Sequence, residues 1–489
     1  MEDSYEYRIK LLDEKFRTYL KNEKSFFADE DEFISLINYY HTSNKNVYAL
    51  LALNKALSYY PHSDILLLMK GVYFFKRQQW NDALTFLVEA YKENTINPDT
   101  LVYLSLTLLY LGNFVEAKNF FRRYIDVDVE DYFIFNMIDT AEFILDSIYQ
   151  ISPTESLYSN KPTLSKVDVV KVKMVLELLD KIINTDSDFN NLVCDKMAIC
   201  YFLLDQYETS ISYLKKSLEL EPFYQNNWVF LSVLYFMQNM INEAIDAVDY
   251  AIAIKPDFDE AHYFKGYIYF FQDDFANALE SYKKITSSTF DDMNTVFYNM
   301  GVCYQMLDDK KQSVRYYLKA LKNNPHDIRT LITMGFLYLE QNDFKNSAYY
   351  LDIAQEEDED NPVLNYALAD LMLHTKDYDQ SLIYIRKSLS QYPFDKDYIL
   401  FLSDLYRAQG KINKSIAVLL ENLNTVDEKE YLLYSLAGLY MQSGKSTNAV
   451  KYLKMAIRED SSLIPFFLET FPEAKEYNKF KGLLNLPSF

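Results

Sequence analysis

A set of segments that recur at a fixed spacing is the feature of this sequence that most restricts its fold. Eight of them follow one another at intervals of 34, 34, 35, 34, 34, 34 and 34 residues, and three more lie upstream, 34 residues apart. Such a period is typical of arrays in which each segment forms one supersecondary unit and packs only against its neighbours. The eleven repeats begin at Glu30, Asp64, Pro98, Asn191, Gln225, Asp259, Asn294, Ile328, Pro362, Lys396 and Glu430.

Residue size recurs with the same period. When the first residue of each repeat is counted as place 1, place 8 is small in ten of the eleven repeats, place 11 is bulky in all, and place 20 is always Ala or Ser. Small residues at places 8 and 20 allow two helices to pack closely, and we expect the bulky residue to fill the space between one pair and the next. Each repeat is therefore predicted to be a helix pair.

Glycine and proline mark the predicted helix ends. Gly112, Gly410 and Gly444 share place 15, near the end of the first helix, where a left-handed cap suits glycine. Five repeats place a proline after the second helix, where it ends the helix. Only 9 glycines and 12 prolines occur in 489 residues, which favours long helices with short links.

The order of small, bulky, small and Pro, as in Gly301, Tyr304, Ser313 and Pro325, resembles the tetratricopeptide repeat. The resemblance covers about residues 30–463. It implies an all-α, right-handed superhelical solenoid of about twelve antiparallel helix pairs with terminal capping helices. It also implies a concave face, lined by first helices, that binds peptides or partner helices.

The repeat pattern is interrupted once. Residues 132–190 keep the helical spacing of apolar residues but lose the repeat, and a stretch around 151–166 that is rich in Ser, Thr, Asn and Pro predicts a loop insertion. We interpret 132–190 as a degenerate repeat, with a hinge between two solenoid segments as the alternative. The predicted order is a capping helix (1–29), three repeats (30–131), the degenerate repeat (132–190), eight repeats (191–463) and a C-terminal cap (464–489).

Charge and hydropathy argue against two kinds of partner. The 49 basic and 71 acidic residues leave a net charge of −22, whereas phosphate binding relies on clustered Lys and Arg, so no nucleic-acid partner is expected. No run of about 18 apolar residues occurs, and the first residues lack the apolar core of a signal peptide. We therefore expect no membrane insertion and a cytoplasmic location.

No catalytic constellation is evident. The five histidines do not pair at metal-ligand spacing, and neither a Gly-rich phosphate loop nor a Gly-x-Ser-x-Gly turn occurs. Cys194, Cys200 and Cys303 show no paired spacing and are interpreted as small core residues. The sequence therefore predicts a protein that is not an enzyme and has no cofactor or metal site.

Places 2, 5, 9 and 12 of the first helix share one helix face. The resemblance implies that this face points into the concave groove. Tyr and Phe are frequent there, and these residues dominate the energetics of interfaces. An alternative is that many of these rings pack between neighbouring first helices. The candidate partner-binding residues are Val229, Val233, Phe236, Tyr263, Tyr267, Phe270, Tyr298, Phe336, Tyr366 and Tyr434.

The charged groove places differ from those of family members that clamp a C-terminal carboxylate with Lys, Arg and Asn. Asp370, Asp397 and Asp404 make the C-terminal part of the groove acidic. A carboxylate clamp is therefore not favoured. The scattered candidates for one are Asn38, Asn226, Arg329 and Arg407.

These patterns predict a protein-binding scaffold or adaptor that holds a partner peptide or helix in an aromatic concave groove. Exposed apolar faces of a solenoid can also be covered by a second copy, so one alternative is a structural solenoid that self-assembles into a homo-oligomer. A regulatory subunit that docks a separate enzyme is a further alternative. The identity of the partner does not follow from the sequence.

Overall fold

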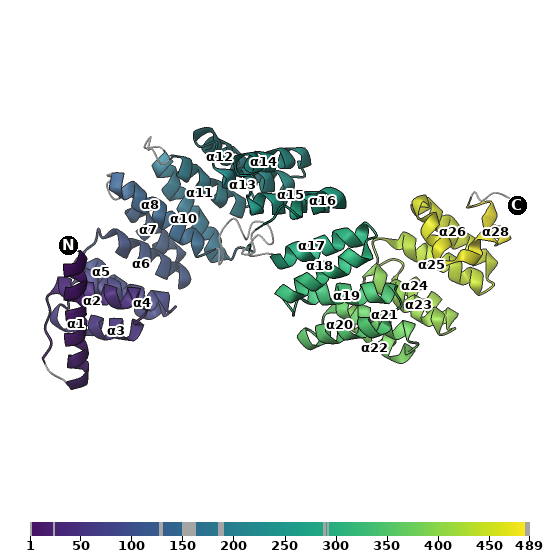
Figure 1. Cartoon of the computed structure of the whole chain (residues 1–489), viewed down its shortest axis with the longest axis horizontal. Coiled ribbons are helices and arrows are strands. Elements are labelled where there is room, and N and C mark those ends of the chain that lie inside the picture. Colours follow the sequence, from purple (N-terminus) through teal and green to yellow (C-terminus); the bar gives the residue numbers. More distant parts are fainter. Residues whose placement is uncertain are drawn as a thin grey trace. The chain divides into compact units, whose positions relative to one another are not determined.

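The computed structural model describes residues 2–22, 25–126, 131–148, 163–183, 190–286, 290 and 293–484. None of these residues lies in a β-strand, and their secondary structure consists of helices (Figure 1). The chain divides into two compact units, residues 1–268 and 269–489. In the part that the structure describes, no helix is long and apolar enough to cross a membrane.

In the N-terminal unit, helices follow one another with short connections. They are α1 (Glu2–Asn22), α2 (Glu30–Thr42), α3 (Asn46–Tyr59), α4 (Asp64–Lys76), α5 (Trp80–Glu93), α6 (Pro98–Tyr110), α7 (Phe114–Ile125), α8 (Asp131–Asp146), α10 (Lys166–Ile183), α11 (Asn190–Leu203), α12 (Tyr207–Leu220), α13 (Gln225–Met237), α14 (Ile241–Ile254) and α15 (Asp259–Phe271), which extends just past the boundary.

The C-terminal unit continues the same alternation. Its helices are α16 (Phe275–Tyr282), α17 (Met293–Met306), α18 (Lys310–Asn323), α19 (Ile328–Glu340), α20 (Phe344–Glu357), α21 (Pro362–His374), α22 (Tyr378–Gln391), α23 (Lys396–Ala408), α24 (Ile412–Asn422), α25 (Lys429–Gln442), α26 (Ser446–Glu459), η1 (Ser461–Leu463), α27 (Ile464–Thr470), η2 (Pro472–Lys475) and α28 (Asn478–Lys481). The predicted all-α solenoid of helix pairs is confirmed.

The small residue at place 8 brings the two helices of a pair into contact. A Cβ atom added to Gly301 would lie 2.5 Å from the ring of Tyr317, and one added to Gly335 would lie 2.4 Å from Leu351. Both partners stand at place 24 of their repeats and are fully buried. Place 8 is therefore small because the side chain from the second helix fills the space that a larger residue would need.

Serine at places 8 and 20 does more than save space. The Ser105 hydroxyl, at place 8, donates to the Ala117 carbonyl at 2.8 Å, and the Ser381 hydroxyl, at place 20, donates to the Ala369 carbonyl at 2.8 Å. All four residues are buried. These hydroxyls link the two helices of a pair across the core, which residue size alone did not predict.

The bulky residue at place 11 packs differently from the prediction. The Tyr338 ring stacks on Tyr350 at a centroid distance of 5.6 Å and an interplanar angle of 3°, and Tyr440 stacks on Tyr452 at 5.3 Å and 7°. Both partners stand at place 23 of the same repeat. The expectation that place 11 fills the space between pairs was therefore wrong for these rings, because the second helix of their own repeat presents an aromatic face.

Every one of the eleven repeats ends its first helix with a left-handed residue at place 15. Three of these residues are the glycines that predicted the turn, but the other eight carry side chains, including Gln78 (φ 59°) and Lys376 (φ 64°). In each repeat the backbone N–H of place 16 donates to the carbonyl of place 11, as Lys445 does to Tyr440 at 2.9 Å. This is the hydrogen bond of a Schellman motif, so one turn geometry serves all eleven pairs.

The interrupted region packs continuously with its neighbours. Buried side chains of α8 and α10, such as Ile144 and Val175, belong to one hydrophobic cluster with residues of α6, α7 and α11. The predicted loop insertion spans residues around 151–166, and its part up to residue 162 lies outside the described residues. The interpretation of 132–190 as a degenerate repeat stays a prediction.

Segments outside the repeats cover both terminal pairs. Phe16 of α1 is fully buried, and its ring lies 5.1 Å from Phe26 and 6.2 Å from Tyr40 of α2. At the other end, Phe467 and Phe480 are buried in a cluster with residues of α25 and α26. The terminal segments thus shield apolar surface that a further repeat would otherwise cover.

Candidate functional site

The first helices of the C-terminal unit place several predicted groove residues side by side. The Tyr366 ring of α21 lies 5.9 Å from Phe336 of α19 and 5.2 Å from Phe401 of α23. Phe336 and Tyr366 are half-buried, whereas Phe401 is buried. We call the surface formed by Phe336, Tyr366, Asp370, Asp397 and Asp404 the Tyr366 face.

Three carboxylates help to raise the pKa of Tyr366. The pKa of Tyr366 is raised to about 12, first by burial and then by the negative charges of Asp370, Asp397 and Asp404. Burial also raises the pKa of each of these three carboxyl groups above its ordinary value. The three carboxylates are therefore partly desolvated. Because all three lie near Tyr366, they create a negative potential there, which favours a bound cation.

The cationic side chains near this face are already engaged. His374 Nδ1 lies 3.2 Å from Asp370 Oδ1, and Arg407 Nη2 lies 3.0 Å from Asp404 Oδ1. The Arg329 guanidinium lies 4.0 Å from the centroid of the Tyr298 ring. Since both arginines are held by residues of the chain itself, the geometry does not favour a clamp for a partner's carboxylate.

The Tyr366 face ends at the C-terminal segment. Tyr434 is fully buried, its hydroxyl donates to the Asp460 carbonyl at 2.8 Å, and its ring lies 5.5 Å from Phe467. Beside it, a Cβ atom on Gly438 would lie 2.5 Å from the Phe471 ring. The prediction of Tyr434 as a groove residue therefore requires correction, because α27 and η2 occupy the surface that it would face.

In the N-terminal unit, three predicted groove residues are also buried. Val229, Val233 and Tyr263 are 1%, 2% and 3% exposed, and both valines pack in a hydrophobic cluster with side chains of α14 and α15. Phe236 and Tyr267 are half-buried, with ring centroids 5.6 Å apart. These three residues are buried and present little surface to a partner. The alternative, in which rings pack between neighbouring first helices, stays a prediction.

Two predicted residues remain on the surface of the C-terminal unit without joining the Tyr366 face. Tyr298 is half-buried beneath Arg329, and its hydroxyl lies 3.4 Å from Thr333 Oγ1. Phe270 is half-buried, with its ring 5.8 Å from Phe275. The structure thus brings together only part of the predicted groove.

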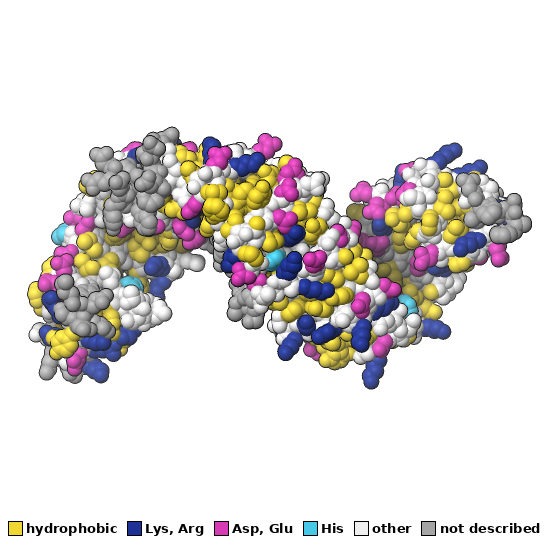
Figure 2. All heavy atoms as spheres, turned by 45° about the horizontal axis from the view of Figure 1, so that its top comes forward, with side chains coloured by type: hydrophobic (Ala, Val, Ile, Leu, Met, Phe, Trp, Pro, Cys, Tyr) yellow, Lys and Arg dark blue, Asp and Glu magenta, His cyan; other side chains and the backbone are white. Residues whose placement is uncertain are grey.

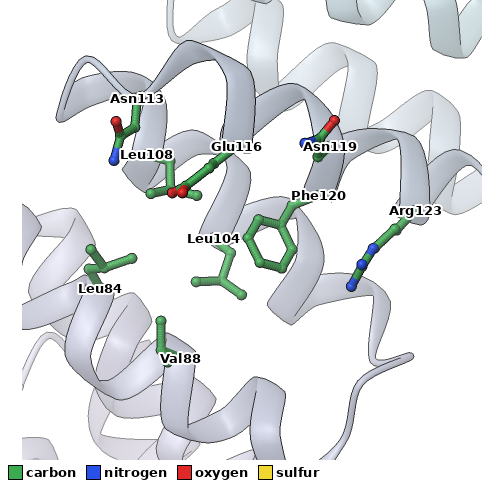
Figure 3. Close-up of a pocket in the computed structure, with 9 residues that line it drawn as sticks. All are labelled: Leu84, Val88, Leu104, Leu108, Asn113, Glu116, Asn119, Phe120 and Arg123. Carbon is green, nitrogen blue, oxygen red and sulfur yellow. The ribbon is translucent and has the colours of Figure 1, made fainter.

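The second-helix side carries cavities that sequence reasoning missed. One of about 430 Å³ lies between α5, α6 and α7, with an apolar wall that includes Leu84, Val88 and Leu104, and a polar edge with Glu116 and Arg123 from α7 (Figure 3). Another, of about 400 Å³, lies between α12, α13 and α14. On the face seen in Figure 2, hydrophobic side chains form patches between charged ones.

Comparisons with known proteins agree with the repeat pattern. Family models described as tetratricopeptide repeat match residues 193–224, 259–292, 295–327, 333–396 and 431–462. No curated protein sequence matches the chain.

Several solved structures match the chain. The APC/C hetero-tetramer Cut9–Hcn1 has 13% identity and a TM-score of 0.40, with 96% of this chain and 94% of that chain covered. Yeast Tom70 has 12% identity and a TM-score of 0.38, with 91% and 99% covered. Pseudomonas aeruginosa PilF has 18% identity and a TM-score of 0.40, with 44% and 98% covered.

The period, the side-chain contacts of the helix pairs and the family matches lead to the same assignment. Solenoids of this kind present extended surfaces for binding other proteins, so the matches support a protein-interaction scaffold in general. The chain contains tetratricopeptide repeats in the matched segments between residues 193 and 462.

Proposed function

We propose that the chain is a scaffold or adaptor that holds a basic peptide or helix of a partner protein against the Tyr366 face. The observation that carries the proposal is the contact between the half-buried rings of Phe336 and Tyr366 on adjacent first helices, together with three carboxylates near enough to raise the pKa of Tyr366. An aromatic anchor provides apolar area for binding, while the carboxylates favour Lys or Arg over acidic segments.

The chemistry of the occupant follows from the charges on this face. Asp370 has His374 as its neighbour, Asp404 has Arg407, and Asp397 has Lys396, which also pairs with Glu428. The carboxylates of Asp370, Asp397 and Asp404 all raise the pKa of Tyr366. A Lys or Arg side chain of a partner would offset their negative potential, and its methylene groups could pack on the rings. An amphipathic basic helix meets both requirements.

Affinity capture with paired variants tests the proposal. The tagged full-length chain would be incubated with an extract of its source cells, and bound proteins would be quantified by mass spectrometry. Asp370→Asn combined with Asp404→Asn should reduce capture of the main partners at least about tenfold. The reason is that the loss of a partly buried charge pair mainly raises the rate at which the complex dissociates. Tyr366→Ala should reduce it as well.

The matched control removes two charges elsewhere. Asp352 of α20 and Asp379 of α22 are exposed on second helices, so Asp352→Asn combined with Asp379→Asn changes the net charge equally without touching the Tyr366 face. Circular dichroism would verify that all variants remain helical. If the control reduces capture as much as the test pair, or if neither does, the Tyr366 face is not the binding site.

A further inference from the structure

The cavity between α12, α13 and α14 has a specific cause in the sequence. In the repeats where place 11 stacks on an aromatic ring, that ring stands at place 23, as Tyr213 does against Tyr201 at 5.4 Å and 10°. In the repeat that begins at Gln225, place 11 is Tyr235 but place 23 is Ala247, and both residues line the cavity. The space that a second ring fills elsewhere is therefore left open beside Tyr235.

Two further rings form an aromatic wall. Trp228 and Tyr250 stack at a centroid distance of 4.7 Å and an angle of 24°, and Tyr250 is 58% exposed. The Trp228 indole N–H donates to the Pro222 carbonyl at 2.8 Å. Since its only donor is used within the chain, Trp228 offers the cavity its π surface, which attracts cations.

The charges around the cavity are mostly negative. Glu219, Glu243 and Asp246 line it, and their side chains form no ion pair or hydrogen bond with another residue that the structure describes. The one lining cation, Lys215, lies 5.6 Å from the centroid of the Tyr235 ring. Three carboxylates against one ammonium group leave an excess of negative charge next to the exposed Tyr250 and the half-buried Trp228 and Tyr235.

The cavity of Figure 3 provides an internal comparison, because it lies at the same register. Its place 19 is Glu116, its place 22 is the neutral Asn119 and its place 26 is the cationic Arg123, where the other cavity has Glu243, Asp246 and Tyr250. One carboxylate and one guanidinium balance there. The same backbone position is thus charge-neutral in one repeat and acidic and aromatic in another.

We propose that the cavity bounded by Trp228, Tyr235, Tyr250, Glu219, Glu243 and Asp246 is a second binding site, which takes the Lys or Arg side chains of a basic segment of a partner protein. The argument is charge complementarity combined with aromatic faces that stabilise a cation. The site rests on the proposed function that the chain binds proteins, but it lies between α12, α13 and α14 of the N-terminal unit and uses none of the residues of the Tyr366 face.

Tryptophan fluorescence can report on this site alone. The chain has two tryptophans, Trp80 and Trp228, so the full-length Trp80→Phe protein leaves Trp228 as the single reporter. Hexalysine would be titrated into this protein at about 50 mM NaCl, where screening between exposed charges is weak. Hexaglutamate, a peptide of opposite charge, would be the control. We expect a saturable change in Trp228 emission with hexalysine only.

Paired variants separate the site from the general field of the acidic chain. Glu243→Gln combined with Asp246→Asn should weaken hexalysine binding at least about tenfold. Glu89→Gln combined with Glu116→Gln removes two charges from α5 and α7, and it should leave the affinity within about twofold. Equal weakening by the two pairs would overturn the proposal, since the field and not the cavity would then govern binding.

Ala247→Tyr provides a test that keeps the charges. The new ring would stand where Tyr213 stands in the preceding repeat, stack on Tyr235 and fill the cavity, so hexalysine should no longer change Trp228 emission while helicity by circular dichroism is retained. A folded Ala247→Tyr protein with an unchanged affinity would refute the site. If Trp228 emission changed when the protein was diluted without hexalysine, the occupant would be a second copy of the chain. That result would also overturn the proposal. Loss of partner capture through the Tyr366 face would leave these fluorescence results unaffected.

Discussion

Gly438→Ala should release the C-terminal segment from α25. A Cβ atom at Gly438 would lie 2.5 Å from three atoms of the Phe471 ring, whereas carbon atoms normally approach to about 3.5–4.0 Å. The ring must therefore retreat by about 1 Å or more. Phe471 is 1% exposed and is held between Phe467, at 5.8 Å, and the Arg407 guanidinium, at 4.8 Å.

The magnitude follows from two opposing effects. Overpacking a filled core costs roughly 1–3 kcal/mol, and a rigid ring that is contacted by three atoms places this substitution near the upper end. Alanine in a helix interior recovers about 1 kcal/mol relative to glycine. The net loss is about 2 kcal/mol. Because the segment is terminal, it can undock without unfolding the stack, so the loss should appear as local opening.

Hydrogen exchange measured by mass spectrometry checks this prediction. Amides of α27, residues 464–470, should exchange roughly 30-fold faster in Gly438→Ala, while helices before α23 keep their rates. Gly335→Ala is the matched control, since its Cβ would lie 2.4 Å from Leu351 in the interior of the stack. It should affect α19 and α20. Unchanged exchange in α27, or an equal effect of both variants on α27, would refute the reasoning.

Two further predictions concern buried polar groups. Ser381→Ala should lower the free energy of unfolding by about 1 kcal/mol, because the Ser381 hydroxyl donates to the Ala369 carbonyl. Ser347→Ala should leave it unchanged or raise it, since the buried Ser347 hydroxyl has no partner among the described residues; urea denaturation of both variants would show the contrast, and equal losses would contradict it. The pKa of Asp195 is raised to about 6, mainly by burial, so the folded state holds this proton more tightly than the unfolded state does. Stability should therefore rise as the pH falls from about 7 to about 5. Asp195→Asn should remove that part of the rise in the urea midpoint, and an unchanged pH dependence would contradict the assignment.

The fold could be predicted from the sequence because place 8 is small in ten of the eleven repeats. At Gly71, Gly301 and Gly335 the side chain at place 24 fills the space that a Cβ atom at place 8 would need, so a period in residue size indicates a period in packing. The turn at place 15 was predicted from three glycines only. Residues such as Gln78 adopt the same left-handed conformation, because the hydrogen bond from place 16 to place 11 holds them there.

The site was harder to predict from the sequence, because the exposure of a side chain depends on which other segments of the chain cover it. Tyr366 and Tyr434 both occupy place 5, but Tyr434 is covered by Phe467 from a segment outside the repeat, which spacing within repeats does not describe. The Trp228 cavity had a signal that could have been found. Ala247 stands at place 23, where five other repeats carry Tyr, two carry Phe and three carry Ala, Ser or Val, and the missing ring opposite Tyr235 is the signal for a cavity.

The shared left-handed turn has a consequence for how such a protein can change. Because the backbone of the connection, rather than the identity of its residue, orients each helix pair, a repeat can exchange surface side chains without altering the stack above and below it. Specificity can then be acquired one repeat at a time. The chain would be able to gain or lose partners through single substitutions in one module, while its neighbours keep theirs.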